Sequence, residues 1–265
     1  MLTNEPVIRL AAFAGVLAIM LLWEGLAPCR APAAGNWVRR LNNLALVAID
    51  TFLLRLAFPV LAVAFAVQME QRGIGLFALL PLPHWLAVAL AILLLDLAIY
   101  WQHRLFHSAP WLWRLHRVHH ADPAFDTTTA LRFHPLEITV SMLIKLAVVA
   151  AMGAPPLAVL LFEIILNATA LFNHGNVSLP AALEARLRWL LVTPDLHRVH
   201  HSVLGREMNR NFGFNMSVWD RWFGSLAAQP REGHSGMIIG LPDFRGSRAQ
   251  WLDRLLLQPF ASSSK

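Results

Sequence analysis

Long apolar stretches leave this chain few folds that it could adopt. Three of them, residues 7–27, 44–67 and 74–100, lie in the first hundred residues. About 20 apolar residues in a helix cross the hydrocarbon core of a bilayer, which is roughly 30 Å thick. With 57% hydrophobic and 14% charged residues, the chain has the wrong composition for a soluble domain. We therefore expect an all-α integral membrane protein.

The stretch 7–27 also has an alternative interpretation, a cleaved signal peptide. The preceding residues lack the basic region that such a peptide needs, and Ala27-Pro-Cys29 is a poor cleavage site. We expect a retained span. A fourth apolar region, 138–172, is divided by Gly153-Ala-Pro-Pro156 into two pieces that are short for independent spans. A helical hairpin that enters and leaves by one face is expected there, which makes about four membrane-embedded elements.

Charged residues inside these stretches indicate where the interior lies. Asp50 and Arg55 interrupt the second stretch, and Asp96 lies within two helical turns of His103. An isolated charge at membrane depth is costly. We expect Asp50 and Arg55 either to pair with each other or to mark an interior face.

The arginines predict the topology. Arg30, Arg39 and Arg40 lie between the first two spans, so the positive-inside rule places that loop in the cytoplasm. Two further crossings and a re-entering hairpin then bring every histidine cluster to the cytoplasmic face. The net charge of +6 comes mostly from arginines outside the apolar runs and suits anionic lipids. A nucleic-acid partner is not expected, because these arginines alternate with histidines and tryptophans beside spans.

Histidines are concentrated in three clusters. The hexapeptide Leu-His-Arg-Val-His-His occurs at 115–120 and at 196–201, and His-Arg-Leu-Phe-His precedes both. On a helix, residues three or four apart share a face, so we expect the histidines of each cluster to converge. The eight are His103, His107, His116, His119, His120, His197, His200 and His201. Eight imidazoles exceed the needs of one ion, which predicts two.

Four histidines stand outside these clusters. We favour His174, in Phe-Asn-His-Gly-Asn, as a ligand, and leave His134, in Arg-Phe-His-Pro-Leu-Glu, undecided. His84 and His234 are interpreted as ordinary side chains.

Other residues near the clusters have two interpretations each. Asp195 and Asp220 could accept hydrogen bonds that orient metal-bound imidazoles, although Asp195 could equally cap a helix. Trp111 and Trp113 are expected in an aromatic belt at the membrane interface.

The donor set restricts the chemistry. The single cysteine, Cys29, lies outside every cluster, and the Glu-x-x-His pairs of soluble di-iron bundles are missing. So is His-Glu-x-x-His, which disfavours a zinc hydrolase. An all-imidazole dimetal site remains, compatible with iron, zinc or copper.

These motifs, in their order and spacing, resemble the fatty acid hydroxylase superfamily, also called the sterol desaturase family. The resemblance extends over 96–225, and one departure is Asn211-Phe-Gly213, where the family often has a central tyrosine. The stretches that carry it are Asp96-Leu-Ala-Ile-Tyr-Trp-Gln-His-Arg-Leu-Phe-His107, His116-Arg-Val-His-His120, Arg132-Phe-His-Pro-Leu-Glu137, Asn173-His-Gly-Asn176, His197-Arg-Val-His-His201 and Trp219-Asp-Arg-Trp-Phe-Gly-Ser225.

The resemblance implies a lipid-modifying oxidoreductase. Its activity would be O2-dependent hydroxylation or desaturation of a lipid C–H bond at a centre of two iron ions, with zinc as a substitute in purified protein. It also implies membrane helices capped by a cytosolic helical domain. The ligands that it carries over are His103, His107, His116, His119, His120, His174, His197, His200 and His201, with His134 as an uncertain tenth.

Electrons for this reaction must come from another protein. The chain has no Gly-x-Gly-x-x-Gly fingerprint, haem-attachment motif or cysteine set for an iron-sulfur cluster. A ferredoxin-like or cytochrome-like donor is expected, docked by the arginines near the clusters.

Three regions are expected along the chain. Residues 1–91 would form the N-terminal transmembrane helices, 92–225 the catalytic region with its hairpin, and 226–265 a loop followed by an interfacial helix at 249–257. The alternative function is a membrane zinc- or copper-binding or transport protein without redox chemistry. It is less favoured because the clusters lie outside the spans. The sequence does not choose among sterol, fatty acyl, ceramide, carotenoid and hopanoid substrates.

Overall fold

The computed structural model describes residues 4–31 and 36–262, and within them every named element is a helix. The longer helices are α1 (Glu5–Leu26), α2 (Asn36–Ala57), α3 (Ala62–Gln71), α4 (His84–Ser108), α5 (Pro110–His120), α6 (Pro135–Met152) and α7 (Pro156–Asn173). The short ones are η2 (Leu76–Leu79), η3 (Thr127–Leu131), α8 (Ala181–Leu187), α9 (Pro194–His200), α10 (Gly205–Met208), α11 (Val218–Trp222), α12 (Gly233–Gly236), η4 (Ser247–Gln250), α13 (Leu252–Leu257) and η5 (Gln258–Phe260).

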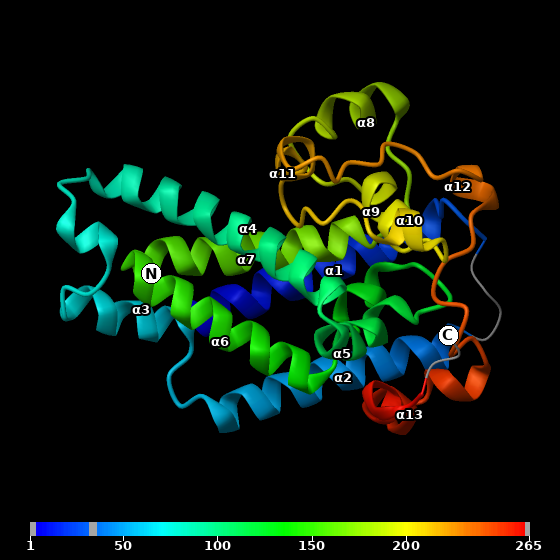
Figure 1. Cartoon of the computed structure of the whole chain (residues 1–265), viewed down its shortest axis with the longest axis horizontal. Helices are drawn as coiled ribbons and strands as arrows, with labels where there is room; N and C mark the ends of the chain where they lie inside the picture. The colour runs from blue at the N-terminus through cyan, green and yellow to red at the C-terminus, as the bar shows by residue number, and fades with distance from the viewer. Residues whose placement is uncertain (1–3, 32–35, 263–265) are drawn as a thin grey trace.

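The molecule is elongated, and its two ends differ (Figure 1). The long helices α1, α2, α4, α6 and α7 run along the long axis, whereas α5 and the short helices α8 to α13 gather at one end. We call this end the cap. The opposite end is formed by α3, η2 and the turn between α6 and α7.

Five stretches of the described chain are long and apolar enough to cross a membrane. They are Glu5–Leu26, Trp37–Leu79, His84–Ser108, Pro135–Met152 and Pro156–Asn173. The expectation of an all-α membrane protein is therefore confirmed. The side of the membrane on which the cap lies stays a prediction.

The second apolar stretch does not form one helix as its continuous run suggested. Helix α2 ends at Ala57 and α3 begins at Ala62. Pro59, between them, lacks a backbone N–H and disfavours helical geometry in the residue before it. The chain therefore turns at this point.

The fourth apolar region forms two successive helices, α6 and α7; whether they enter and leave the membrane by one face stays a prediction. Each has 18 residues, or about 27 Å at 1.5 Å per residue, so each is longer than the apolar run suggested. Gly153 ends α6 with a positive φ of 64°. A Cβ on Gly75 would lie 2.0 Å from the Gly153 nitrogen, so only glycine permits this close contact.

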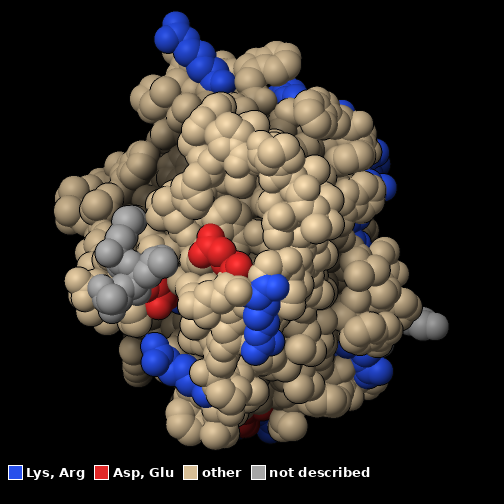
Figure 2. All heavy atoms as spheres, turned by 90° about the vertical axis from the view of Figure 1, so that its left-hand side faces the viewer, with Lys and Arg blue, Asp and Glu red and all other residues tan. Residues whose placement is uncertain are grey.

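Charges within the spans are few, and most are paired. The end of the molecule opposite the cap is largely uncharged, with small groups of acidic atoms at and below its centre and basic side chains close by (Figure 2). In α7, the Glu163 carboxylate lies 2.7 Å from Lys145 Nζ and 3.1 Å from Arg9 Nη1. This cluster joins α1, α6 and α7.

Asp96 anchors the cap to the membrane helices. It accepts hydrogen bonds from Trp219 Nε1 at 2.8 Å and from the Asn215 backbone N–H at 3.3 Å. The carboxylate therefore supports the loop that carries Asn211 to Asn215 rather than a histidine.

The C-terminal segment is shorter and less exposed than the predicted interfacial helix. Trp251 separates η4 from α13, and the fully buried Leu255 packs against Leu46 and Val118. Its apolar face therefore contacts the protein.

Candidate metal centre

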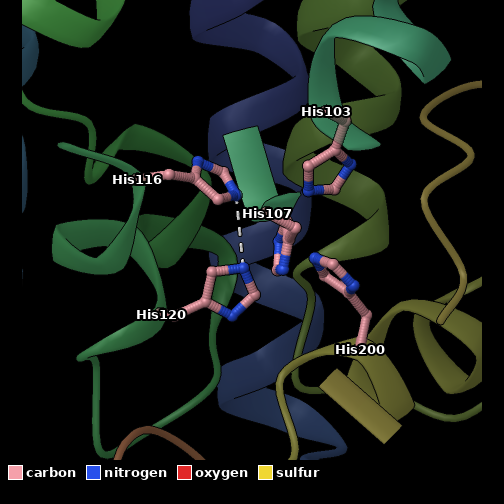
Figure 3. A group of neighbouring side chains, drawn as sticks. All are labelled: His103, His107, His116, His120 and His200. Carbon is pink, nitrogen blue, oxygen red and sulfur yellow. Dashed lines mark hydrogen bonds between the residues drawn. The ribbon is translucent and has the colours of Figure 1, made fainter. Parts of the chain in front are cut away.

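Nine histidines form two adjacent groups whose ring nitrogens converge. In each group the possible ligand atoms all lie within 4.8 Å of one another. The first histidine group is His103, His107, His116, His120 and His200, and the second is His119, His174, His197 and His201. Figure 3 shows the first group, with imidazoles from three helices directed at a common space. All nine are buried except His107, which is partly exposed.

Each copy of the repeated hexapeptide is divided between the groups. Helix α5 gives His116 and His120 to the first group and His119 to the second. The segment from α9 gives His197 and His201 to the second group and His200 to the first. The expectation that the histidines of each cluster converge is therefore confirmed for His103 and His107 and wrong for the two hexapeptides. Residues at i+3 and i+4 lie about 100° apart around a helix, so one helix faces two sites.

Hydrogen bonds at Nδ1 fix several rings. The Nδ1 atoms of His103, His174 and His200 lie 3.0, 2.8 and 2.7 Å from the carbonyl oxygens of Phe212, Ala170 and Arg210. A carbonyl only accepts, so Nδ1 carries the proton and Nε2 keeps its lone pair. Metal-bound histidines usually show this arrangement.

His116 is held by a carboxylate. Its Nδ1 lies 2.6 Å from Glu137 Oε1 in α6. Sequence reasoning did not single out Glu137 as a site residue, although it closes the Arg132-Phe-His-Pro-Leu-Glu137 motif. The sequence signal that could have identified it is a carboxylate directly before the apolar stretch 138–172.

The positions of the Nε2 lone pairs are those expected of metal ligands. His174 Nε2 lies 2.9 Å from His197 Nε2 and 3.1 Å from His119 Nε2. One lone pair cannot accept two good hydrogen bonds, but metal–nitrogen bonds of about 2.0–2.1 Å at right angles place nitrogens about 3 Å apart. The Nε2 atoms of His103, His107 and His200 are also buried without a partner among the described residues.

Burial keeps the imidazoles neutral. It lowers the pKa of His116 to about 3 and that of His174 to about 4. Burial first, and neighbouring imidazoles second, hold the pKa of five others well below the usual value. These are His119, His120, His197, His200 and His201. Ligand nitrogens are therefore available at neutral pH.

His134 lies in neither group. Its Nδ1 accepts from the Leu136 N–H at 3.1 Å, which caps α6, and its Nε2 lies 3.1 Å from the Leu256 carbonyl oxygen. Both ring nitrogens are thus used within the protein. His134 therefore connects the start of α6 with the C-terminal segment.

The two aspartates differ. Asp220 accepts from the backbone N–H groups of Phe212 and Gly213, both at 2.8 Å, and so holds the loop whose carbonyls orient His103 and His200. It does not touch an imidazole. Asp195 neither caps a helix nor orients an imidazole of the two histidine groups. Thr193 caps α9, and Asp195 pairs with Arg198 at 2.7 Å.

The two tryptophans lie in different surroundings. Trp111 is exposed, as a belt residue would be, but the Trp113 ring lies 5.1 Å from that of His107 and 5.5 Å from that of His120. Trp113 therefore covers one side of the first histidine group.

A cavity of about 830 Å³ connects the histidines with the long helices. His103, His116, His119 and His197 line it, together with side chains of α1, α2, α4, α6 and α7 and of the segment before α6. Most of these are apolar, including Phe13, Leu54, Phe133 and Met142. Its volume is in the range of ligand pockets.

The sequence is similar to one family model and to several known proteins. The model of the fatty acid hydroxylase family matches residues 88–225. Ornithine lipid hydroxylase OlsE of Rhizobium tropici is 29% identical over 178 residues, covering 67% of this chain and 51% of that protein. Human alkylglycerol monooxygenase is 26% identical, covering 61% and 35%. Fatty acid hydroxylase vlmA of a Lecanicillium species is 28% identical, covering 63% and 50%.

The matched part thus spans about half or less of these relatives. No solved structure matches the chain.

Proposed function

This chain belongs to the fatty acid hydroxylase family, and we propose that it hydroxylates a C–H bond of a membrane lipid with O2. The observation that carries the proposal is the apolar cavity whose inner end is lined by imidazoles of both histidine groups. A lipid chain in this cavity would present its carbons directly to the site. The relatives' names, hydroxylase and monooxygenase, favour hydroxylation over desaturation.

We propose two iron ions as the resident metals. The first histidine group would hold one and the second the other, with zinc as a substitute in purified protein. When bound, iron supplies the O2 activation and electron transfer that oxidation of an unactivated C–H bond requires. Nine of the ten predicted ligands belong to this proposal, and His134 does not.

The protein's own groups prepare the site in three ways. Glu137 and the carbonyls of Ala170, Arg210 and Phe212 keep the bound rings in one tautomer. The apolar walls hold the lipid and exclude water. Trp113 closes the side of the first histidine group next to His107.

A separate protein would supply the electrons. His107 is the only partly exposed member of the two groups, and its Nδ1 lies 3.3 Å from the Oδ1 of the exposed Asn209. Arg206 and Arg210, also exposed, flank Asn209 in sequence. We propose that an acidic ferredoxin-like or cytochrome-like donor docks here, with anionic lipids against other surface arginines.

The first experiment is the metal content of detergent-purified protein expressed with added iron, together with mass spectrometry of lipids from cells with and without the gene. About two irons per chain and a lipid heavier by one oxygen would support the proposal. Tightly bound zinc or copper with an unchanged lipidome would instead favour a metal-binding or transport protein.

A further inference from the structure

Helix α2 carries two opposite charges that line the cavity without pairing. Asp50 is 5% exposed, and no described residue forms a hydrogen bond or ion pair with it. Arg55, five residues further, is exposed and forms no ion pair among the described residues. Both line the same cavity. Of the two alternatives expected for these residues, the mutual ion pair is absent among the described residues; Asp50 lies on the interior face, and Arg55 lies at an exposed part of the same cavity.

Asp50 is exceptional among the buried acids of the described spans. Glu24 accepts from the backbone N–H groups of Thr127 and Asn176, while Asp96, Glu137 and Glu163 have the partners given above. A buried carboxyl group without a partner is costly in a membrane protein, and such a residue points to a functional site. Each other buried acid of the described spans has at least one donor, whereas Asp50 lines the cavity without one.

A second unpartnered acceptor lies in the same cavity. Gln102, next to His103 in α4, donates to Ser141 Oγ at 3.0 Å, but its Oε1 is buried without a partner. Gln102 and Ser141 both line the cavity. Glu137 Oε2, in the same cavity, is a third buried acceptor without a hydrogen-bond partner among the described residues. Several such acceptors in one mainly apolar cavity indicate a ligand that brings hydrogen-bond donors.

We propose that Asp50 and Arg55 bind the zwitterionic head group of the lipid substrate. Asp50 and Gln102 accept from its ammonium group, and Arg55 binds its phosphate or carboxylate. Five residues of helix separate the two Cα atoms by about 7.5 Å along the axis and about 140° around it. Because the long Arg55 side chain lines the same cavity as Asp50, its guanidinium would reach an acid a few bonds from the amine that Asp50 binds. The inference rests on the proposed function and gives it a substrate class.

The test compares lipid binding without turnover. Full-length, iron-loaded protein in detergent is mixed, without O2 or reductant, with dioleoylphosphatidylethanolamine, its N-acetyl derivative, an acylated amino-acid lipid with free amine and carboxylate, and neutral diacylglycerol. Native mass spectrometry measures the bound fractions. The wild type should prefer each zwitterionic lipid to the N-acetyl and neutral lipids about tenfold or more, as expected for a charge-assisted hydrogen bond in a dry site. Phosphate and carboxylate lipids are distinguished by which binds more tightly.

Variants on the same helix supply the controls. Asp50→Asn, which keeps the volume, should abolish the preference for a free amine, and Arg55→Gln should weaken binding of both zwitterionic lipids. Leu53→Asn places an amide on α2 at a residue outside the cavity lining and should keep the wild-type preference. An unchanged preference in Asp50→Asn, or equal binding of diacylglycerol by the wild type, would overturn the proposal.

Failure of this inference can be told apart from failure of the proposed function. Head-group preference without any lipid oxidation would leave the binding site standing and remove the hydroxylase. Lipid hydroxylation without head-group preference would support the hydroxylase and refute the head-group site. The comparison of lipids on the wild type needs no variant to fold.

Discussion

At the scale of single residues, histidines with similar sequence surroundings have different places in the structure. His200 belongs to the first group and His119 to the second, while His134 caps α6. Nine of the ten histidines predicted as ligands from the sequence lie in these two groups. Sequence spacing could not predict their division between two sites, because that depends on how α4, α5 and α9 face one another.

His119→Ala and His200→Ala should each lower lipid oxidation at least about a hundredfold, since a lost ligand removes an ion that the reaction requires. Iron per chain should fall while the protein remains folded in detergent. His134→Ala is the control. It should keep two irons and lose only about 1 kcal/mol of stability with the cap. Full activity in either ligand variant would refute the metal assignment.

Glu137 should matter through His116. Glu137→Leu removes the acceptor for Nδ1 and should reduce iron affinity or activity about 10- to 100-fold. Glu137→Gln keeps an oxygen acceptor and should restore much of the loss. Iron titration of both variants checks this, and equal loss in the two would contradict the orienting role.

The buried imidazoles predict how the metal-free protein responds to acid. The pKa values of His116 and His174 lie near 3 and 4, below the ordinary value near 6.5. Between these limits the unfolded chain binds more protons than the folded one, so stability falls as pH drops from about 6.5 towards 4. The thermal midpoint of iron-free protein should decrease from pH 7.5 to pH 5. A constant midpoint would show that the rings are accessible to protons in the folded state.

At the scale of helices, the ion cluster around Glu163 fixes how α1, α6 and α7 pack. The hydrophobic pattern predicted the division of the fourth apolar region into two pieces, but not the break between α2 and α3, nor that residues as far apart in sequence as Arg9 and Glu163 would meet. Such contacts depend on tertiary packing that a local pattern does not contain.

Glu163→Leu should destabilise this helix packing strongly. It leaves Lys145 and Arg9 without their shared carboxylate at membrane depth, and removing one partner of a buried pair costs about 3–5 kcal/mol. Thermal unfolding in detergent measures the effect. Asp253→Asn, which breaks an ion pair with Arg248 on the surface, should leave the midpoint unchanged, and a similar loss in both would contradict the cluster's role.

At the scale of the whole molecule, the two histidine groups lie where the cap meets the membrane helices. In the function that we propose, the lipid would enter through the cavity and the electron donor would dock at His107, so that the two arrive from different directions. Arg206→Glu combined with Arg210→Glu should raise the KM for an acidic donor about tenfold, because like charges then oppose docking. Turnover with a small uncharged reductant should stay unchanged. A loss with both reductants would mean that the arginines support the fold instead.

The division of each hexapeptide between the two histidine groups has a consequence for assembly. Helix α5 gives two imidazoles to one site and one to the other, and the α9 segment does so in the opposite proportion. The first ion to bind would therefore already order helices that carry ligands for the second. Loading should be cooperative, with chains that hold a single ion the rarest species during titration.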